Sequence, residues 1–269
     1  MDYSQEKIIA YIRYLKNTYD LEISIHFKKK YSYVPLNPSA HQLSEYNNHA
    51  NPYCLYVKNI LGMQKKCLLC QTAAIRKCSR SDGRIGTCHA GVREYIRPIP
   101  VHGENAGILC VSGYRGEPLQ CRAPEAMQHL KKDPVPLDFL EMVIPPLTLM
   151  VSTLIEHLPP PLAQNAVYTE ITNYLNHHYN QVTLEQLSTE LNYSKSAISH
   201  LFKHESGQSI RRYCNQLKIN DAKRLLLETN MSITEIALCV GFNNFSYFIK
   251  TFKQLTSKTP SEWRKQRRK

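Results

Sequence analysis

The sequence has no stretch of about 20 uninterrupted apolar residues, the length that a membrane-spanning helix needs. Its longest apolar run, at residues 142–155, is interrupted by Pro145 and Pro146. The N-terminus is amphipathic and carries acidic residues early, so it lacks the basic start and apolar stretch of a secretion signal. No long low-complexity tract is present either. We therefore expect a folded cytoplasmic protein with no membrane partner.

The cysteines are also poorly suited to a disulfide framework. They number nine, an odd count, and seven of them precede residue 122. Thiols in the cytoplasm are kept reduced. The cysteines therefore need another explanation.

Length and charge indicate two domains and a polyanionic partner. A chain of 269 residues with 42% apolar residues suits two modules of common size, each with its own core. The formal net charge is +12, and basic character is denser in residues 166–269, which hold 15 Lys and Arg against 8 Asp and Glu. Such a balance favours nucleic acid as the partner.

A proline-rich segment at residues 158–165 predicts the boundary between the domains, because proline runs cannot continue a helix and act as semi-rigid spacers. Within the first domain, residues 1–157, alternating apolar residues predict strands at 21–27, 95–101 and 107–114. Helical spacing appears at residues 3–19 and 138–157, and turn residues at 103–106 predict a hairpin. The fold class is α+β, with a mixed N-terminal domain.

The second domain, residues 166–269, is predicted to be all-α, since helical spacing replaces alternation throughout it. The expected helices are residues 168–179, 184–191, 195–204, 210–228, 233–240 and 245–255. Thr183 with Gln186, and Ser232 with Glu235, have the spacing of capping boxes that begin helices.

Two of the expected helix pairs repeat the same pattern. Residues 184–203 and 233–253 each place two short helices on either side of a tight turn, about 50 residues apart. Gly241 stands where the second turn needs a left-handed residue. The helix expected between the pairs, residues 210–228, would be roughly 28 Å long, close to the ~34 Å turn of B-DNA. Two helix-turn-helix units joined by a long helix could therefore enter successive major grooves.

These residues carry a family resemblance. The segments 232–237 (SITEIA), 240–242 (VGF), 246–248 (SYF) and 259–264 (TPSEWR) resemble the signature of AraC/XylS-type regulators, and 222–226 (AKRLL) resembles their linker helix. Ser257 departs from the family's usual glycine, and Lys218 from its common arginine. The resemblance implies sequence-specific binding to double-stranded DNA, usually activation of transcription, and RNA polymerase as a partner.

The side chains opposite the core of each second helix are the candidate DNA contacts. Asn can bond adenine bidentately, Lys can reach guanine or phosphate, and Ser is adaptable. The candidate base readers are Lys195, Ser196, Ser199, His200, Asn243, Asn244, Ser246, Tyr247 and Lys250. Lys203, Lys253 and Arg264 are predicted phosphate contacts, which supply affinity and salt dependence. The alternative is that these are solvated faces of a helical bundle, and the basic end at 264–269 a frayed terminus.

The cysteines cluster in residues 54–89. Cys67 and Cys70 form a C-x-x-C pair, and Cys78 and Cys88 could complete four ligands for zinc or an iron–sulfur cluster. The alternatives are buried structural or pocket thiols, since Cys67 and Cys70 lie one helical turn apart, and a redox sensor.

The same region resembles the PocR-type sensory domain, a PAS-like module. The segment 67–78, the motif 88–91 (CHAG) and the strand that contains 97–99 (RPI) carry this resemblance, and 112–114 (SGY) departs from it. It implies a small-molecule effector bound between sheet and helices, for which Cys88, His89 and Arg97 are the candidate ligand-binding residues.

The combined prediction is a transcription regulator, not an enzyme, whose first domain senses an effector and controls DNA binding. The apolar helix at 138–157 is a candidate homodimer or domain interface. A metal- or redox-sensing regulator that uses Cys67, Cys70, Cys78 and Cys88 is the alternative. Regulators that also repair DNA by alkyl transfer are a further class, but the first domain offers no convincing nucleophile setting.

Overall fold

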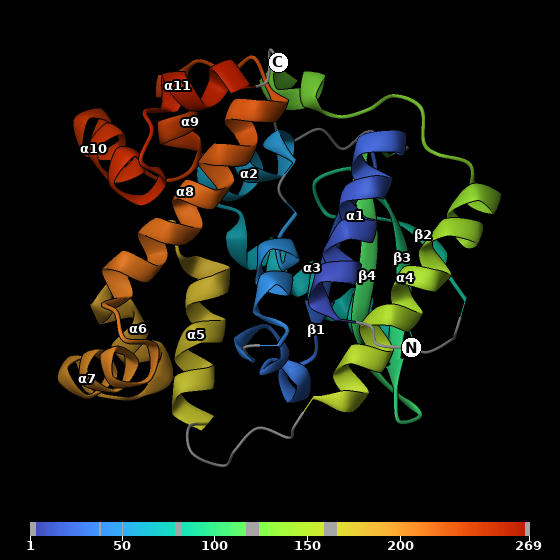
Figure 1. Ribbon diagram of the computed structural model, residues 1–269, viewed down its shortest axis with the longest axis horizontal. Coiled ribbons are helices and arrows are strands. Elements are labelled where there is room, and N and C mark those ends of the chain that lie inside the picture. Colours follow the sequence, from blue (N-terminus) through green and yellow to red (C-terminus); the bar gives the residue numbers. More distant parts are fainter. Residues whose placement is uncertain are drawn as a thin grey trace. The chain divides into compact units, whose positions relative to one another are not determined.

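The computed structural model describes residues 4–37, 39–49, 51–78, 82–116, 124–158 and 166–266. The chain divides into two compact units, one of residues 1–57 with 65–164 and one of residues 58–64 with 165–269. The first contains a β-sheet, and the described part of the second is helical (Figure 1). An N-terminal sheet region is thus followed by a helical C-terminal region. Residues 159–165 of the predicted linker lie outside the described residues.

The sheet is antiparallel, with strand order β1-β4-β3-β2. Its strands are β1 (Glu22–Phe27), β2 (Arg84–Thr87), β3 (Val92–Val101) and β4 (Glu104–Arg115). The three predicted strands are confirmed, but the hairpin turn is shorter than expected. Val101 pairs with Glu104, which leaves His102 and Gly103 as a two-residue turn with φ of 48° and 78°. Two positive φ values match the twist of the flanking strands, so residues 104–106 stay within β4.

One face of the sheet packs against α1 (Gln5–Tyr19) and α4 (Leu137–His157). Alternate residues of the strands, such as Ile25, Leu109 and Val111, supply the sheet's side of this core. Helix α4 continues through Pro145 and Pro146, as the helical spacing of residues 138–157 predicted. Burial of its apolar face outweighs the hydrogen bonds that two prolines remove.

By length and composition, α4 is apolar enough to cross a membrane, with a mean hydropathy of 1.5. Half of the most apolar stretch of this helix is buried inside the protein, which is typical of the core helix of a folded domain.

The opposite face of the sheet is more polar. Here α3 (Gln64–Lys77) packs through Ala74 and Ile75 onto a small cluster that includes Ile108 and Cys110. Helix α2 (Pro52–Asn59) precedes α3, and the hydroxyl of Tyr53 donates to the carbonyl of Ala90 at 2.7 Å. Four short 3-10 helices, Lys29–Tyr31, Val34–Leu36, His41–Tyr46 and Pro124–His129, complete the unit.

The helical unit contains α5 (Ala166–His178), α6 (Leu184–Leu191), α7 (Lys195–Ser206), α8 (Ile210–Glu228), α9 (Ile233–Cys239), α10 (Phe245–Thr256) and α11 (Pro260–Lys265). Both predicted capping boxes are confirmed, at Thr183 and Ser232. A third box, between Thr259 and Glu262, begins α11 with a proline in its first turn.

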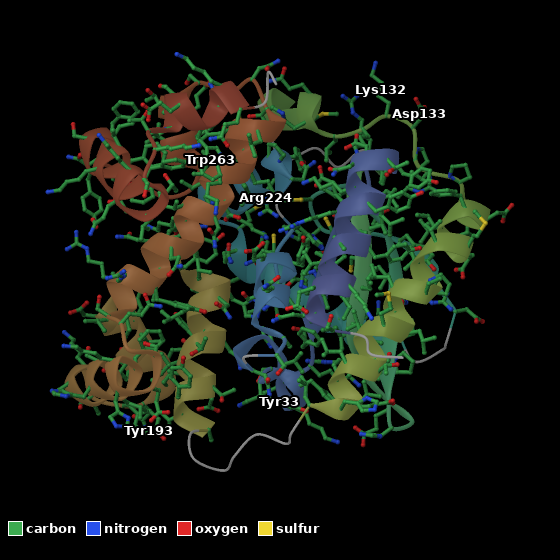
Figure 2. The ribbon with its side chains drawn as sticks, in the orientation of Figure 1. Tyr33, Lys132, Asp133, Tyr193, Arg224 and Trp263 are labelled. Atoms are coloured by element: carbon green, nitrogen blue, oxygen red, sulfur yellow. The ribbon has the colours of Figure 1, made fainter. Side chains whose placement is uncertain are left out.

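Aromatic contacts pack the last helix, α11, against the rest of this unit. Trp263 of α11 lies 6.0 Å from Phe252 between ring centroids, and Lys223 lies over the Trp263 ring at 5.4 Å. Trp263 and Arg224 are labelled in Figure 2, and Arg224 forms an ion pair with Asp221 at 2.6 Å. The two contacts of Trp263 hold α11 against α10 and α8.

Candidate functional site

Two helix pairs in the helical unit, α6 with α7 and α9 with α10, have matching local geometry. Asn192 after α6 and Gly241 after α9 both have a left-handed backbone, with φ of 57° and 84°. At the ends of α7 and α10, the hydroxyls of Ser206 and Thr256 donate to carbonyls four residues earlier, at 2.6 and 2.8 Å. The repeated pattern in the sequence therefore corresponds to repeated backbone and capping geometry.

Helix α7 turns Ile198 and Phe202 inward and leaves its other face to solvent. Of the residues predicted to contact DNA from this helix, Lys195, Ser196, His200 and Lys203 are exposed and Ser199 is half-buried. Lys195 forms an ion pair with Glu185 of α6, which competes with an external anion for its ammonium group.

Helix α10 has the same polarity. Phe248, Thr251 and Phe252 are buried. The candidate contacts Asn243, Asn244, Ser246, Lys250 and Lys253 are exposed, and Tyr247 is half-buried. The side-chain oxygen of Asn244 accepts from the Tyr247 amide at 2.8 Å and so caps the helix. This leaves the Asn244 amide nitrogen as its group able to donate to a base.

A cleft with a volume of about 550 Å³ separates the two helix pairs, and α8 supplies part of its lining. Ser199 and Lys203 line it from α7, and Asn243, Asn244 and Tyr247 line it from the start of α10. The α8 residues that line the cleft include Arg211, Asn215 and Lys218.

Arg211 and Asn215 are functional candidates that the sequence analysis missed. Arg211 and Asn215 are four residues apart, and Lys218 follows three residues later, so the three lie along one face of a helix. This spacing is the feature of the sequence that could have identified them. Asn215 donates to the Tyr247 hydroxyl at 2.8 Å, and the Arg211 guanidinium lies 5.1 Å from the Tyr247 ring centre. Burial alone would raise the pKa of Tyr247, but hydrogen bonds from Asn215, Thr251 and Arg211 outweigh it and lower that pKa. Arg211 and Asn215 therefore fix the position of this candidate base reader.

Two basic residues face inward instead. The Lys218 ammonium donates to the Gly241 carbonyl at 2.7 Å, and burial lowers its pKa. Arg264, predicted to contact phosphate, donates to the Met231 carbonyl at 2.6 Å. Both side chains thus have structural contacts within this unit.

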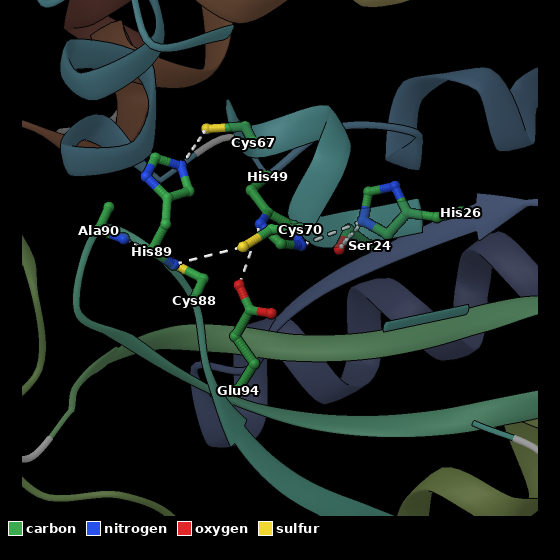
Figure 3. A network of polar contacts seen from close by, with 9 residues as sticks. All are labelled: Ser24, His26, His49, Cys67, Cys70, Cys88, His89, Ala90 and Glu94. Carbon is green, nitrogen blue, oxygen red and sulfur yellow. Dashed lines mark hydrogen bonds and ion pairs between the residues drawn. The ribbon is translucent and has the colours of Figure 1, made fainter. Parts of the chain in front are cut away.

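In the sheet-containing unit, four of the predicted sensor residues lie close together. Cys67 Sγ of α3 is 3.2 Å from His89 Nε2, and the His89 amide donates to Cys70 Sγ at 3.4 Å. Cys88, next to His89 in the β2–β3 loop, accepts from the Ala90 amide at 3.4 Å (Figure 3).

Cys78 and Arg97 have other surroundings. Cys78 is buried in the apolar cluster with Ile96 and Ile108. Arg97 projects from the sheet face that meets α4, where it pairs with Glu141 at 2.6 Å. The structure therefore does not bring Arg97 together with Cys88 and His89.

The thiol of Cys88 is not activated. Cys88 forms no disulfide. Burial, and secondly the charge of Glu94, raises the pKa of Cys88 to about 12. A nucleophilic or redox-active thiol needs a lowered pKa, so Cys88 is poorly suited to either role.

Two further histidines and a carboxylate of this region were not predicted from the sequence. His26, His49 and Glu94 are buried beside the thiols (Figure 3). The alternation in β1 placed His26 on the face opposite Ile25, but this face was not read as a separate polar surface.

Comparison with known proteins assigns the helical unit. Residues 187–266 match the model of a helix-turn-helix domain. A relative from Bacillus subtilis, the uncharacterized HTH-type transcriptional regulator YisR, is 36% identical over 106 residues, which are 39% of this chain and 37% of the relative. The bifunctional transcriptional activator/DNA repair enzyme AdaA of Bacillus subtilis is 36% identical over 95 residues, 35% of this chain and 45% of that protein.

Among solved structures, a transcriptional regulator from Chromobacterium violaceum with an AraC-type DNA-binding domain is 28% identical, with a TM-score of 0.35. The match covers 37% of this chain and 90% of that structure. The chain spans less than half the length of the two curated relatives named above.

Proposed function

We propose that the whole chain is a cytoplasmic transcription regulator of the AraC type that binds specific double-stranded DNA, because residues 187–266 match a helix-turn-helix domain. The observation that carries the proposal is the pair of exposed polar helix faces, on α7 and α10, that flank one cleft. Each face presents Ser, Asn, His or Lys side chains of the kinds that bond base edges.

The two faces have separate tasks in this proposal. Ser196, Ser199 and His200 read bases from α7, and Asn243, Ser246 and Lys250 read them from α10. Lys203 and Lys253 contact phosphates, because they are exposed cations near the ends of the same helices. Arg211 in the cleft supplies a further phosphate contact beside Tyr247.

We also propose that the sheet-containing domain is a PAS-like sensor for a small-molecule effector. The support is the set of buried polar side chains Ser24, His26, His49 and Glu94 in this domain. Burial of polar side chains costs free energy unless hydrogen bonds within the fold or to a ligand compensate it. Effector binding would change DNA binding or homodimerisation, and the bound protein would recruit RNA polymerase as an activator.

An enzymatic role receives less support. The relative AdaA is named a DNA repair enzyme, but it matches only 35% of this chain. Burial raises the pKa of Cys78, Cys88, Cys110, Cys214 and Cys239, whereas a thiol that accepts an alkyl group needs a lowered pKa. A regulator without catalytic activity is therefore the preferred reading.

The test is to capture sheared genomic DNA of the source organism with the full chain and to sequence the bound fragments. We expect a small set of enriched sites that share a sequence motif, and that change in occupancy with a candidate metabolite. The double variant Lys203→Ala/Lys250→Ala should lose this enrichment. Lys132→Ala removes an exposed lysine of the other unit and is the matched control. Uniform recovery of fragments by the unaltered chain would contradict specific binding.

A further inference from the structure

The sheet face that α3 covers carries a compact group of buried polar side chains. Ser24 and Cys110 are opposite each other in the β1–β4 pairing, and His26 lies two residues further along β1 on the same face. His49, from the segment before α2, joins this group (Figure 3). His26, His49 and Cys110 are all buried.

The distances within the group are short. His26 Nε2 lies 3.1 Å from His49 Nε2 and 3.0 Å from the Ser24 hydroxyl. The ligand atoms of His26, His49 and Cys110 all lie within 4.8 Å of one another. Among the described residues, no other three His, Cys, Asp or Glu side chains meet this condition.

Glu94 determines how His49 faces the group. Its carboxylate lies 3.3 Å from His49 Nδ1, on the far side of the imidazole ring from His26. With the Nδ1 proton directed at Glu94, the lone pair of a neutral His49 is on Nε2 and is directed at His26. A carboxylate that holds a histidine in this tautomer is the usual outer partner of a zinc-bound histidine.

We propose that His26, His49 and Cys110 bind one zinc ion. In a tetrahedral zinc site, nitrogen ligands at 2.0–2.1 Å from the metal are roughly 3.3 Å apart, and a thiolate sulfur is roughly 3.6 Å from each nitrogen. The observed nitrogen separation of 3.1 Å is close to the first value. Both histidines would bind as neutral imidazoles, and Cys110 would form the zinc–sulfur bond as its thiol proton passes to solvent.

The proposed site has three protein ligands, which leaves the fourth position for water or an external ligand. It differs from the set Cys67, Cys70, Cys78 and Cys88 that the sequence predicted, because none of those thiols is a ligand. It also goes beyond the proposed DNA binding and does not depend on it, since metal binding is measured without DNA.

The experiment uses the full chain, reduced and stripped of metal by a chelator. Co²⁺ serves as the spectroscopic probe, because a thiolate ligand gives an intense charge-transfer band that nitrogen and oxygen ligands do not. We expect one equivalent of Co²⁺ to produce this band and one equivalent of Zn²⁺ to abolish it. Cys110→Ser should lose the band, and His49→Gln should weaken binding at least 100-fold.

Two further variants separate this site from the alternatives. Cys67→Ser/Cys70→Ser, the control, should keep the band and the stoichiometry of one. Glu94→Gln keeps all three ligands and should weaken Zn²⁺ binding about 10- to 100-fold while retaining the band, so it carries the test if a ligand variant fails to fold. Absence of metal binding at micromolar concentrations would overturn the proposal. So would a band that survives Cys110→Ser and disappears in Cys67→Ser/Cys70→Ser.

Discussion

For single residues, the left-handed backbone that ends two equivalent helices has a different free-energy cost in each helix. Gly207 ends α7 and Ser257 ends α10, with φ of 68° and 62°. Glycine adopts this left-handed conformation freely, whereas a residue with a Cβ pays about 1 kcal/mol or more for it. Ser257 therefore carries strain that Gly207 does not.

Exchanging these residues should move stability in opposite directions. We expect Ser257→Gly to raise the free energy of unfolding by about 0.5–1 kcal/mol, since relief of strain exceeds the added freedom of the unfolded chain. Gly207→Ser should lower it by about 1 kcal/mol, because the new Cβ would have open space and meets only the cost of its φ. Urea unfolding followed by circular dichroism measures both. Equal effects of one sign would contradict the assignment.

The raised pKa of the Cys88 thiol should make this thiol unreactive at neutral pH. With its pKa raised from 9.0 to about 12 by burial and by Glu94, the protonated form dominates at pH 8, and reactivity returns only as the pH approaches the raised value. The thiolate fraction is then about 1,000-fold below that of an ordinary thiol.

We expect iodoacetamide at pH 8 to label Cys88 in the folded protein at least 100-fold more slowly than in urea, as quantified by mass spectrometry of peptides. Glutathione in the same mixture controls for reagent strength. Similar rates in the folded and unfolded protein would show that the thiol is accessible and ionised.

At the scale of elements, the tight turn in each helix pair is set by one left-handed residue. Asn192 occupies this position after α6 and Gly241 after α9. Asparagine tolerates the conformation, but a Cβ at position 241 would also lie 2.9 Å from the Asn180 carbonyl oxygen. The second turn therefore needs glycine for two reasons.

Gly241→Ala should lower the free energy of unfolding by about 2 kcal/mol or more, since strain and a backbone clash add. Asn192→Gly is the matched change in the other pair, and we expect it to alter stability by less than about 0.5 kcal/mol. Denaturant titration measures the free energy of unfolding of both variants. A small effect of Gly241→Ala on this free energy would show that the turn can adjust to a Cβ.

Local signals explain which elements could be predicted from the sequence. Helices α6 and α8 begin and end at the predicted residues, and Thr183 and Ser209 cap their N-termini. Strand β2 (Arg84–Thr87) was missed, since four residues that include a glycine give no alternating pattern. Its position depends on pairing with β3, which is a tertiary contact.

The candidate sites also differ in how far local sequence patterns predict them. The exposed residues of α7 and α10 follow from helical periodicity once the core side is known. The grouping of His26, His49 and Cys110 requires three segments that are distant in the sequence to meet, which local spacing does not reveal. The sequence instead drew attention to Cys67 and Cys70, which are close together in the chain.

At the scale of the whole molecule, electrostatics links the basic charge to a polyanion. The formal net charge of +12 includes exposed lysines on α7 and α10. Each phosphate contact releases a counterion, so affinity for DNA should fall steeply as salt concentration rises.

Lys250→Ala should weaken binding to a selected DNA site and reduce the slope of log affinity against log salt by about 1, if the ammonium contacts phosphate as well as a base. Lys132→Ala, on the sheet-containing unit, should leave the slope unchanged. Fluorescence anisotropy of a labelled duplex at several salt concentrations measures both. An unchanged affinity and slope for Lys250→Ala would remove this residue from the DNA interface.

We propose that α7 and α10 bind one DNA duplex together. Hydroxyl-radical footprinting of the full chain on its most enriched genomic fragment tests it most directly. We expect two protected segments on one face of the duplex, about 10 base pairs apart, since successive major grooves repeat at that interval. A single protected segment would contradict joint reading by the two helices, and the absence of protection would contradict specific DNA binding.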